Sequence, residues 1–247
     1  MKKHWIYVIS IIVLFMVWFL LYLIIDHQLI LPSPLHVFRK LTIMASTYKM
    51  YQIIFHTLLR LFLAISLSAL IGIILAMLSY FHTQFKLLIK PYITILRTIP
   101  VISIVVILLI VLGFTWTPYV ITFLMVFPII YQGTLHGLES INHELIDVIK
   151  LEEKHVIIMI FGFYIPQIKS NIFLSFLQSF SLGLKVLVMA EYLAQTKNSI
   201  GNELYLAKVN LFYDEVFAWT IVLILIATLI ELFIYQRMRH IHKQSVH

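Results

Sequence analysis

An all-α, polytopic membrane protein with about six transmembrane helices is the fold class that this sequence predicts. Of its 247 residues, 62% are hydrophobic and only 12% are charged, and the mean hydropathy is +0.99. Soluble domains are roughly 45–50% apolar and about 25% charged, so this composition does not suit a water-soluble surface. Cysteine is absent, which excludes disulfides and thiolate metal sites. No linker or repeat divides the chain, and residues 1–247 are predicted to form one membrane domain.

The first predicted span covers residues 5–25, which contain no charged side chain and follow Lys2 and Lys3. A spanning helix needs about 20 mostly apolar residues. A secretory signal peptide is the alternative, but its apolar region is roughly 7–15 residues long and ends at a small-residue cleavage site, which is lacking here. We therefore expect an uncleaved span that precedes the core of the domain.

The core is predicted to extend from about residue 54 to 235 and to contain five further spans. Their approximate ranges are 54–81, 92–113, 118–138, 171–193 and 216–235. Pro100 lies inside the third span, where a proline frees a carbonyl group and kinks the helix. Gly72 and several Ser and Ala residues give the second span a face that another helix can approach closely.

Six spans place both termini on one side of the membrane, and the distribution of Lys and Arg indicates which side. Ten basic residues fall in segments on the N-terminal side: Lys2, Lys3, Lys86, Lys90, Lys150, Lys154, Lys169, Arg237, Arg239 and Lys243. Five fall on the opposite side: Arg39, Lys40, Lys49, Lys197 and Lys208. By the positive-inside rule, both termini and the hydrophilic interval 139–169 are expected to be cytoplasmic.

This cytoplasmic interval has the pattern of two short helices joined by a turn. Asn142 is the predicted N-cap of the first helix, on which Leu145, Val148 and Ile149 form one apolar stripe. A second apolar run over residues 156–163 predicts the other helix. Both helices are expected to lie across the cytoplasmic face, ahead of the fifth span.

The same interval resembles the cytoplasmic loop of ABC importer permeases, whose signature is Glu-Ala-Ala, three residues, Gly, nine residues and Ile-x-Leu-Pro. The matching positions are Asp147, Val148, Ile149, Glu153, Ile165 and Pro166. The spacing matches without a gap, and Glu153 occupies the glycine place. A glycine permits the positive φ that glutamate accommodates poorly, so the turn between the two helices is expected to be reshaped.

Further motifs follow in the order found in permeases of the nitrate/sulfonate/taurine type. They are Leu31-Pro-Ser-Pro-Leu35, His56-Thr-Leu-Leu-Arg60, Leu96-Arg-Thr-Ile-Pro100, Ala190-Glu191 and Ser199-Ile-Gly201. The resemblance therefore covers nearly the whole chain, and the chain is identified as similar to the permease subunits of this importer type.

The resemblance implies a set of partners in a bacterial cell membrane. Two permease subunits, expected to be two copies of this chain, would form the pathway in the lipid bilayer, and two ATPase subunits would bind the segment around Asp147. A solute-binding protein would deliver the substrate to the outer face, and ATP-driven closure of the ATPases would rock the spans. No Walker motif is present, so ATP is expected to be bound by the partner, and neither a cofactor nor a nucleic acid is expected.

Four residues are candidates for the translocation path or its gate: Arg97, Pro100, Lys185 and Glu191. Lys185 lies midway along the fifth span, where a charge is costly and faces a cavity or a partner. It can attract an anion such as a sulfonate, taurine or nitrate, or it can pair with a carboxylate or carbonyl groups at a subunit interface. Arg97 and Glu191 lie nearer span ends, which favours snorkelling to the membrane interface. A pyrimidine precursor of thiamine is the alternative substrate.

Two other functional classes are less well supported by the sequence. An intramembrane enzyme needs a nucleophile, a base or a metal set within the spans, and His143-Glu144-Leu-Ile-Asp147 lacks the second histidine of H-E-x-x-H. A stand-alone secondary transporter favours broken helices in corresponding positions of two half-repeats, whereas the proline-kinked third span has no counterpart. ATPase and binding-protein genes beside this one would favour the importer.

Overall fold

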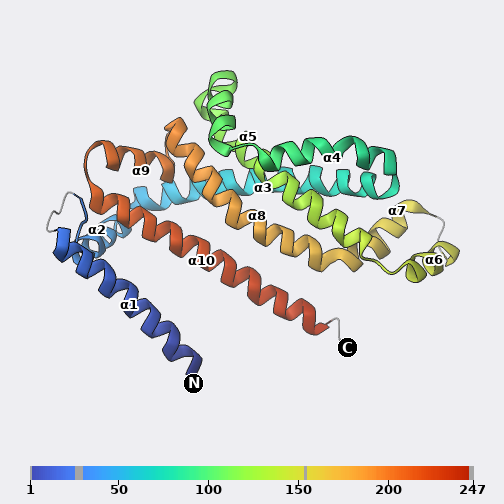
Figure 1. Cartoon of the computed structure of the whole chain (residues 1–247), viewed down its shortest axis with the longest axis horizontal. Helices are drawn as coiled ribbons and strands as arrows, with labels where there is room; N and C mark the ends of the chain where they lie inside the picture. The colour runs from blue at the N-terminus through green and yellow to red at the C-terminus, as the bar shows by residue number, and fades with distance from the viewer. Residues whose placement is uncertain (1, 26–29, 153–154, 245–247) are drawn as a thin grey trace.

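The computed structural model describes residues 2–25, 30–152 and 155–244, and every regular element within these ranges is a helix. The predicted all-α class is therefore confirmed. Figure 1 shows the long helices side by side along the longest axis of the molecule, with α9 (Ile200–Val209) near one end and α6 (His143–Glu152) at the other. We call these the α9 end and the α6 end.

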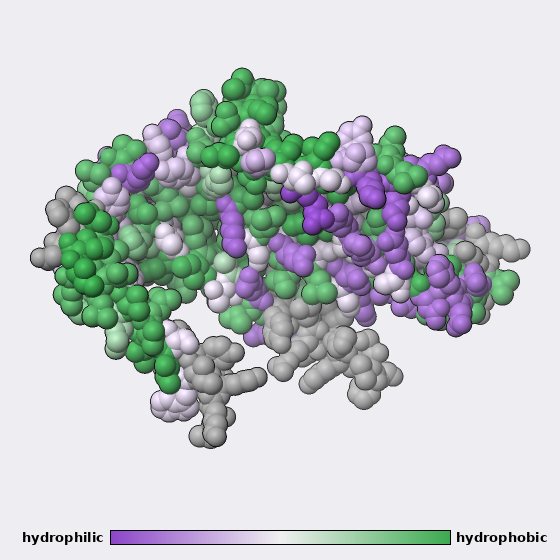
Figure 2. Space-filling model, viewed as in Figure 1, coloured by the Kyte–Doolittle hydropathy of each residue, from purple (hydrophilic) through white to green (hydrophobic). Residues whose placement is uncertain are grey.

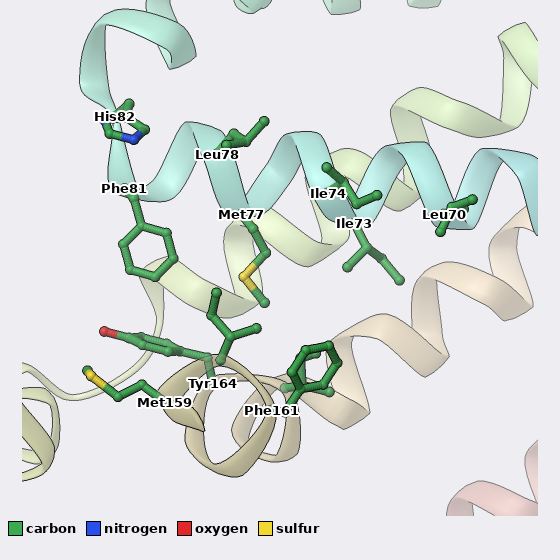
Figure 3. Close-up of a pocket in the computed structure, with 12 residues that line it drawn as sticks. Leu70, Ile73, Ile74, Met77, Leu78, Phe81, His82, Met159, Phe161 and Tyr164 are labelled. Atoms are coloured by element: carbon green, nitrogen blue, oxygen red, sulfur yellow. The ribbon is translucent and has the colours of Figure 1, made fainter. Parts of the chain in front are cut away.

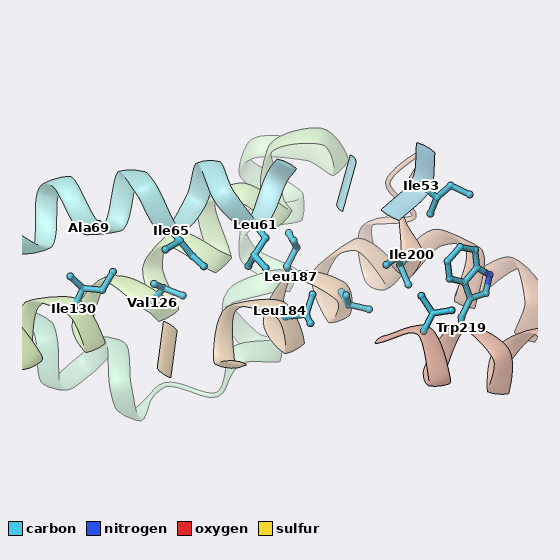
Figure 4. Packing of buried hydrophobic residues seen from close by; sticks show 12 residues of the cluster. Ile53, Leu61, Ile65, Ala69, Val126, Ile130, Leu184, Leu187, Ile200 and Trp219 are labelled. Carbon is cyan, nitrogen blue, oxygen red and sulfur yellow. The ribbon is translucent and has the colours of Figure 1, made fainter. Parts of the chain in front are cut away.

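Three long helices form the packed centre: α3 (Tyr48–Phe81), the second part of α5 (Val101–Glu139) and α8 (Ile165–Ala194). Their buried residues include Leu61 and Ile65 of α3, Val126 of α5 and Leu187 of α8 (Figure 4). A Cβ atom on Gly72 would lie 3.2 Å from the backbone nitrogen of Tyr131. The predicted close-approach face of the second span is therefore confirmed, because a side chain at this position would be a tight fit between α3 and α5.

Four helical stretches in the described ranges are long and apolar enough to cross a membrane: 48–81, 101–139, 157–194 and 213–233. The last belongs to α10 (Tyr213–Gln244). The predicted first span is α1 (Lys2–Ile25), of which Ile12–Ile25 counts as a shorter apolar helix. In Figure 1, α1 leads away from the bundle, and the stacked rings of Trp18 and Phe217 join it to α10.

The predicted third span is divided between α4 (Thr83–Thr98) and the first part of α5. Ile99 and Pro100 are both extended, because a proline disfavours the helical conformation of the residue before it. The predicted kink at Pro100 is thus confirmed as a complete break between two helices.

The third and fourth spans meet at Gly113, whose φ of 72° and ψ of −176° are open essentially to glycine alone. The predicted ranges placed residues 114–117 between the two spans, whereas the helix resumes directly after Gly113. The two spans are therefore joined by a single glycine, and α5 contains both sides of the kink.

Two short helices cover the α9 end. In α2 (Pro34–Ala45), Ser33 Oγ accepts the backbone N–H of His36 at 3.3 Å and Pro34 starts the first turn, a position that tolerates its missing N–H. In α9, Ser199 Oγ accepts the N–H of Asn202 at 3.0 Å. Ion pairs attach these helices to their surroundings, with Lys40 bound to Glu215 and Lys49 bound to Glu203.

The segment before the fifth span differs from the prediction. Asn142 Oδ1 accepts the N–H of Glu144 at 3.0 Å, so the predicted N-cap of α6 is confirmed. The second predicted short helix is not separate, because α7 (Val156–Met159) and the π-helix η1 (Ile160–Tyr164) run without interruption into α8. The expectation of an independent helix across the cytoplasmic face is wrong, and the fifth span begins near residue 157 rather than 171.

Pro166 explains this continuity. A proline ring inside a helix clashes with the carbonyl group four residues earlier and removes one hydrogen bond. A π-turn placed just before the proline widens the helix and accommodates the ring without a break. The chain between residues 157 and 194 therefore remains one helical rod, with η1 as its irregular turn.

Candidate functional site

A buried cluster at the α9 end is centred on Glu191, near the end of α8. Arg60 Nη1 donates to Glu191 Oε1 at 3.0 Å, and Thr57 Oγ1 donates to Oε2 at 3.1 Å. The backbone N–H of Gly201 donates to Oε2 at 3.3 Å. Glu191 is fully buried. A carboxylate in the interior is tolerated when it is paired and hydrogen-bonded, and this one has donors from α3 and α9. We call Thr57, Arg60, Glu191 and Gly201 the Glu191 cluster.

The Glu191 cluster also fixes the loop between α8 and α9. Arg60 donates to the carbonyl oxygens of Lys197 at 3.1 Å and Asn198 at 3.2 Å. Two loop residues, Gln195 and Asn198, have φ values of 49° and 53°, a region that non-glycine residues rarely occupy. The guanidinium group therefore holds a strained loop against α3, and the surroundings supply the contacts that such strain requires.

Gly201 is required by the close packing of α9 on α8. A Cβ atom at this position would overlap the backbone nitrogen of Tyr192 and the side chain of Glu191. The N–H of Ile200, the preceding residue, donates to Thr57 Oγ1 at 3.1 Å. Three motifs that lie far apart in the sequence, 56–60, 190–191 and 199–201, thus meet in one place.

Sequence reasoning matched each of these motifs separately and did not predict that they meet. Arg60 and Glu191 are opposite charges within two apolar spans, which is the signal that could have indicated an ion pair. The expectation that Glu191 snorkels to the membrane interface is wrong, because Arg60 and Thr57 neutralise and solvate its carboxylate inside the protein.

Lys185 and Arg97, the two cationic candidates for the path, are both exposed on the isolated chain. Among the described residues, no acidic side chain forms an ion pair with Lys185. Arg97 Nη1 donates to Gln132 Oε1 at 2.6 Å and so links the end of α4 to α5. Pro100 lies in the break between α4 and α5. Its neighbour Val101 packs against an apolar cluster that contains Val186 of α8.

At the α6 end, α6 is attached to the spans through Ile146. This side chain is 4% exposed and belongs to an apolar cluster with Leu138, Tyr164 and Ile168. The predicted apolar stripe of α6 lies on a different face of the helix from Ile146. Leu145 and Val148 are 48% and 55% exposed, and Ile149 is half-buried. The anchor was therefore missed by the periodicity argument, and most of the stripe is free surface on the isolated chain.

The remaining loop residues of the signature have different surroundings. Asp147 is exposed on α6, while Ile165 and Pro166 lie in the first turn of α8. Glu153 lies outside the described residues, so the reshaped turn stays a prediction. In the part of the chain that the structure describes, no cluster of three potential metal ligands occurs.

The polar surface is unevenly distributed over the molecule. Figure 2 shows hydrophilic side chains gathered over the half of this face that contains α6 and α4, and hydrophobic ones over the half that contains α1 and α9. An ion pair between Lys86 of α4 and Glu139 of α5 lies at the same polar end. The membrane-spanning helices therefore end in a polar surface at the α6 end.

One family of known proteins matches this chain. Residues 68–246 match the model of the family described as binding-protein-dependent transport system inner membrane component. The match covers more than two thirds of the chain and includes the C-terminal part of α3 and all of α4 to α10. No curated protein matches the chain.

Proposed function

This chain belongs to the family of binding-protein-dependent transport system inner membrane components, the permease family of ABC transporters, and on that premise we propose that it forms the translocation path of an ATP-driven importer for a small solute. Members of this family are components of transport systems and are multi-pass proteins of the inner membrane. The observation that carries the proposal for this chain is the exposed face of α6, held against the spanning helices by a buried anchor.

This face combines apolar and acidic side chains. Leu145, Val148 and Leu151 are exposed, the last at 84%, and Asp147 lies among them. Exposed apolar side chains that gather on one helix are typical of a surface that a partner covers. Because Ile146 on the opposite side is buried against Tyr164 and Ile168, a displacement of α6 acts directly on the start of α8. We propose that α6 docks in a groove of the ATPase partner.

The other partners follow from the same proposal. A second copy of this chain completes the pathway, and a solute-binding protein docks at the α9 end. The α6 end and both termini face the cytoplasm, in agreement with the excess of Lys and Arg on that side. ATP is bound and hydrolysed by the ATPase partner, so the chain itself needs no cofactor and has no enzymatic activity, and we propose no nucleic-acid partner.

Co-purification tests the docking of α6. The chain, extracted in detergent, is expected to retain an ABC ATPase that is produced together with it, and Asp147→Lys or deletion of residues 144–155 should abolish retention. Lys208→Asp reverses an exposed charge on α9, at the opposite end of the molecule, and serves as the matched control. Retention of the ATPase by the deletion variant would exclude α6 as the docking element.

Lys185 supports a small anion as the substrate, such as a sulfonate, taurine or nitrate. A lysine without an ion-pair partner among the described residues, midway along a span, needs a water-filled path or a partner to solvate it. ATP-driven uptake of the anion is expected to fall at least tenfold in Lys185→Met and to persist in Lys185→Arg. Unchanged uptake and substrate preference in Lys185→Met would contradict this role. That result would leave a pyrimidine precursor of thiamine as the competing substrate.

A further inference from the structure

The π-helical turn η1 lies inside the fifth span, between α7 and α8, and close in sequence to the docking helix α6. Its defining hydrogen bond runs from the N–H of Ile165 to the carbonyl oxygen of Ile160, five residues earlier. A π-turn holds one residue more than the α-helical turn it replaces, and such turns are frequent at functional sites. Any rotation of α6 and α7 relative to α8 passes through this turn.

A cavity of about 940 Å³ lies beside η1. Its walls are the α6-end half of α3 on one side and α7, η1 and the start of α8 on the other (Figure 3). Leu78 and Phe81 line the first wall, and Met159 and Phe161 line the second. Leu78 and Phe161 are 41% and 68% exposed on the isolated chain, so the cavity is open to one side and leaves room for side chains of η1 to move toward α3.

The middle of η1 is also uncrowded. A Cβ atom on Gly162 would meet no other atom within 4 Å, in contrast to the crowded Gly72 and Gly201. Two residues later, Tyr164 is almost fully buried, and its ring contacts those of Tyr80 and Phe81 with centroids 5.7 Å and 5.4 Å away. The turn therefore has a fixed C-terminal side and an unobstructed middle.

The exposed and the half-buried faces of this segment are both apolar. Ile157, Ile158 and Phe161 are exposed, whereas Met159 and Ile160 are half-buried against the cluster around Tyr164. Rotation of α7 about its axis exchanges one set of apolar side chains for another. The change in buried apolar area is correspondingly small, so two registers of the helix differ little in hydrophobic free energy.

We propose that η1 rewinds between the π and the α conformation and so converts movement of α6 into rotation of α7 relative to α8. Shifting the helix by one residue turns it by about 100° and advances it by about 1.5 Å. In the rewound state, Phe161 occupies the cavity against Leu78, while Tyr164 keeps its ring contacts as the pivot. This inference rests on the proposed docking of α6 to the ATPase.

Cross-linking across the cavity tests the movement, and the absence of native cysteine makes single pairs specific. The chain with Leu78→Cys and Phe161→Cys is assembled with its ATPase in lipid nanodiscs and treated with a short thiol cross-linker. The yield should change at least threefold between the nucleotide-free state and the state with a non-hydrolysable ATP analogue. The control pair, Lys49→Cys with Glu203→Cys, replaces two side chains in contact at the α9 end and should not respond. Equal yields in both states for the first pair would overturn the proposal.

A helix-straightening variant gives a second test. Deletion of Gly162 combined with Pro166→Ala removes the extra residue and the ring that the π-turn accommodates. The variant should still bind the ATPase but lose at least tenfold of ATP-driven uptake, whereas Leu174→Ala, on an exposed and regular part of α8, should retain uptake. Normal uptake in the double variant would overturn the hinge and leave the docking of α6 standing. Failure of the unmodified chain to bind the ATPase would overturn both.

Discussion

The α9 end and the α6 end of this permease are built differently. At the α9 end, the carboxylate of Glu191 has hydrogen-bond donors from two helices, and Arg60 holds the following loop by its carbonyl groups. At the α6 end, a cavity of about 940 Å³ lies beside η1, and Ile146 is the buried anchor of α6 among its described side chains. The stability of a protein is not uniform, and segments that move are drawn from its less stable part. The comparison assigns rigidity to the α9 end and movement to the α6 end.

The largest expected effect concerns the buried ion pair of the α9 end. Glu191→Ala leaves Arg60 without its carboxylate, and removing one partner of a buried pair costs about 3–5 kcal/mol of the free energy of unfolding. Reversible unfolding in detergent micelles measures this loss. Lys49→Ala breaks the exposed pair with Glu203 at the same end and should cost less than about 1 kcal/mol. Equal losses in the two variants would contradict the rigidity of the Glu191 cluster.

A pair of glycine substitutions compares the two ends directly. Gly201→Ala forces a methyl group against Tyr192 and Glu191, and overpacking of this kind costs about 1–3 kcal/mol of the free energy of unfolding. Gly162→Ala adds the same methyl group where no atom lies within 4 Å, and it should leave this free energy unchanged or raise it by about 0.5–1 kcal/mol. Thermal unfolding of both variants in the same detergent checks the difference. A loss at Gly162 as large as that at Gly201 would mean that η1 is as tightly packed as the α9 end.

The smallest expected effect is at the polar surface of the α6 end. The side chains of Lys86 and Glu139 are 42% and 36% exposed, so solvent screens their attraction and Lys86→Ala should cost less than about 1 kcal/mol. The loss should shrink further at high salt, where exposed charges are screened more strongly. A loss above 2 kcal/mol in the same unfolding measurement would show that this pair, like Arg60 and Glu191, holds the fold together.

The features that follow local rules were predicted from the sequence. Apolar length identified the spans, Pro100 marked the break in the third span, and Asn142 capped α6. The continuity from residue 157 into α8 was missed, because a proline signals a disrupted turn without specifying that a π-turn will accommodate it. Local pattern therefore located the elements but did not define how two of them join.

The features that depend on packing between distant segments were not predicted. Thr57 and Glu191 are 134 residues apart, and nothing in either motif states that the two side chains meet. On α6, periodicity selected Leu145, Val148 and Ile149, whereas the anchor is Ile146, because the position of the spans decides which face of a short helix is buried. Nothing in the described residues tests Lys185 and Arg97 as path residues, so both stay predictions.

The central claim is that the exposed face of α6 binds the ATPase, and an affinity measurement tests it most directly. Val148 and Val209 are nearly equally exposed, at 55% and 56%, and lie on short helices at opposite ends of the molecule. Binding of the purified ATPase to the chain in nanodiscs should weaken at least tenfold in Val148→Asp and stay unchanged in Val209→Asp. Equal affinities of the two variants and the unmodified chain would contradict the claim.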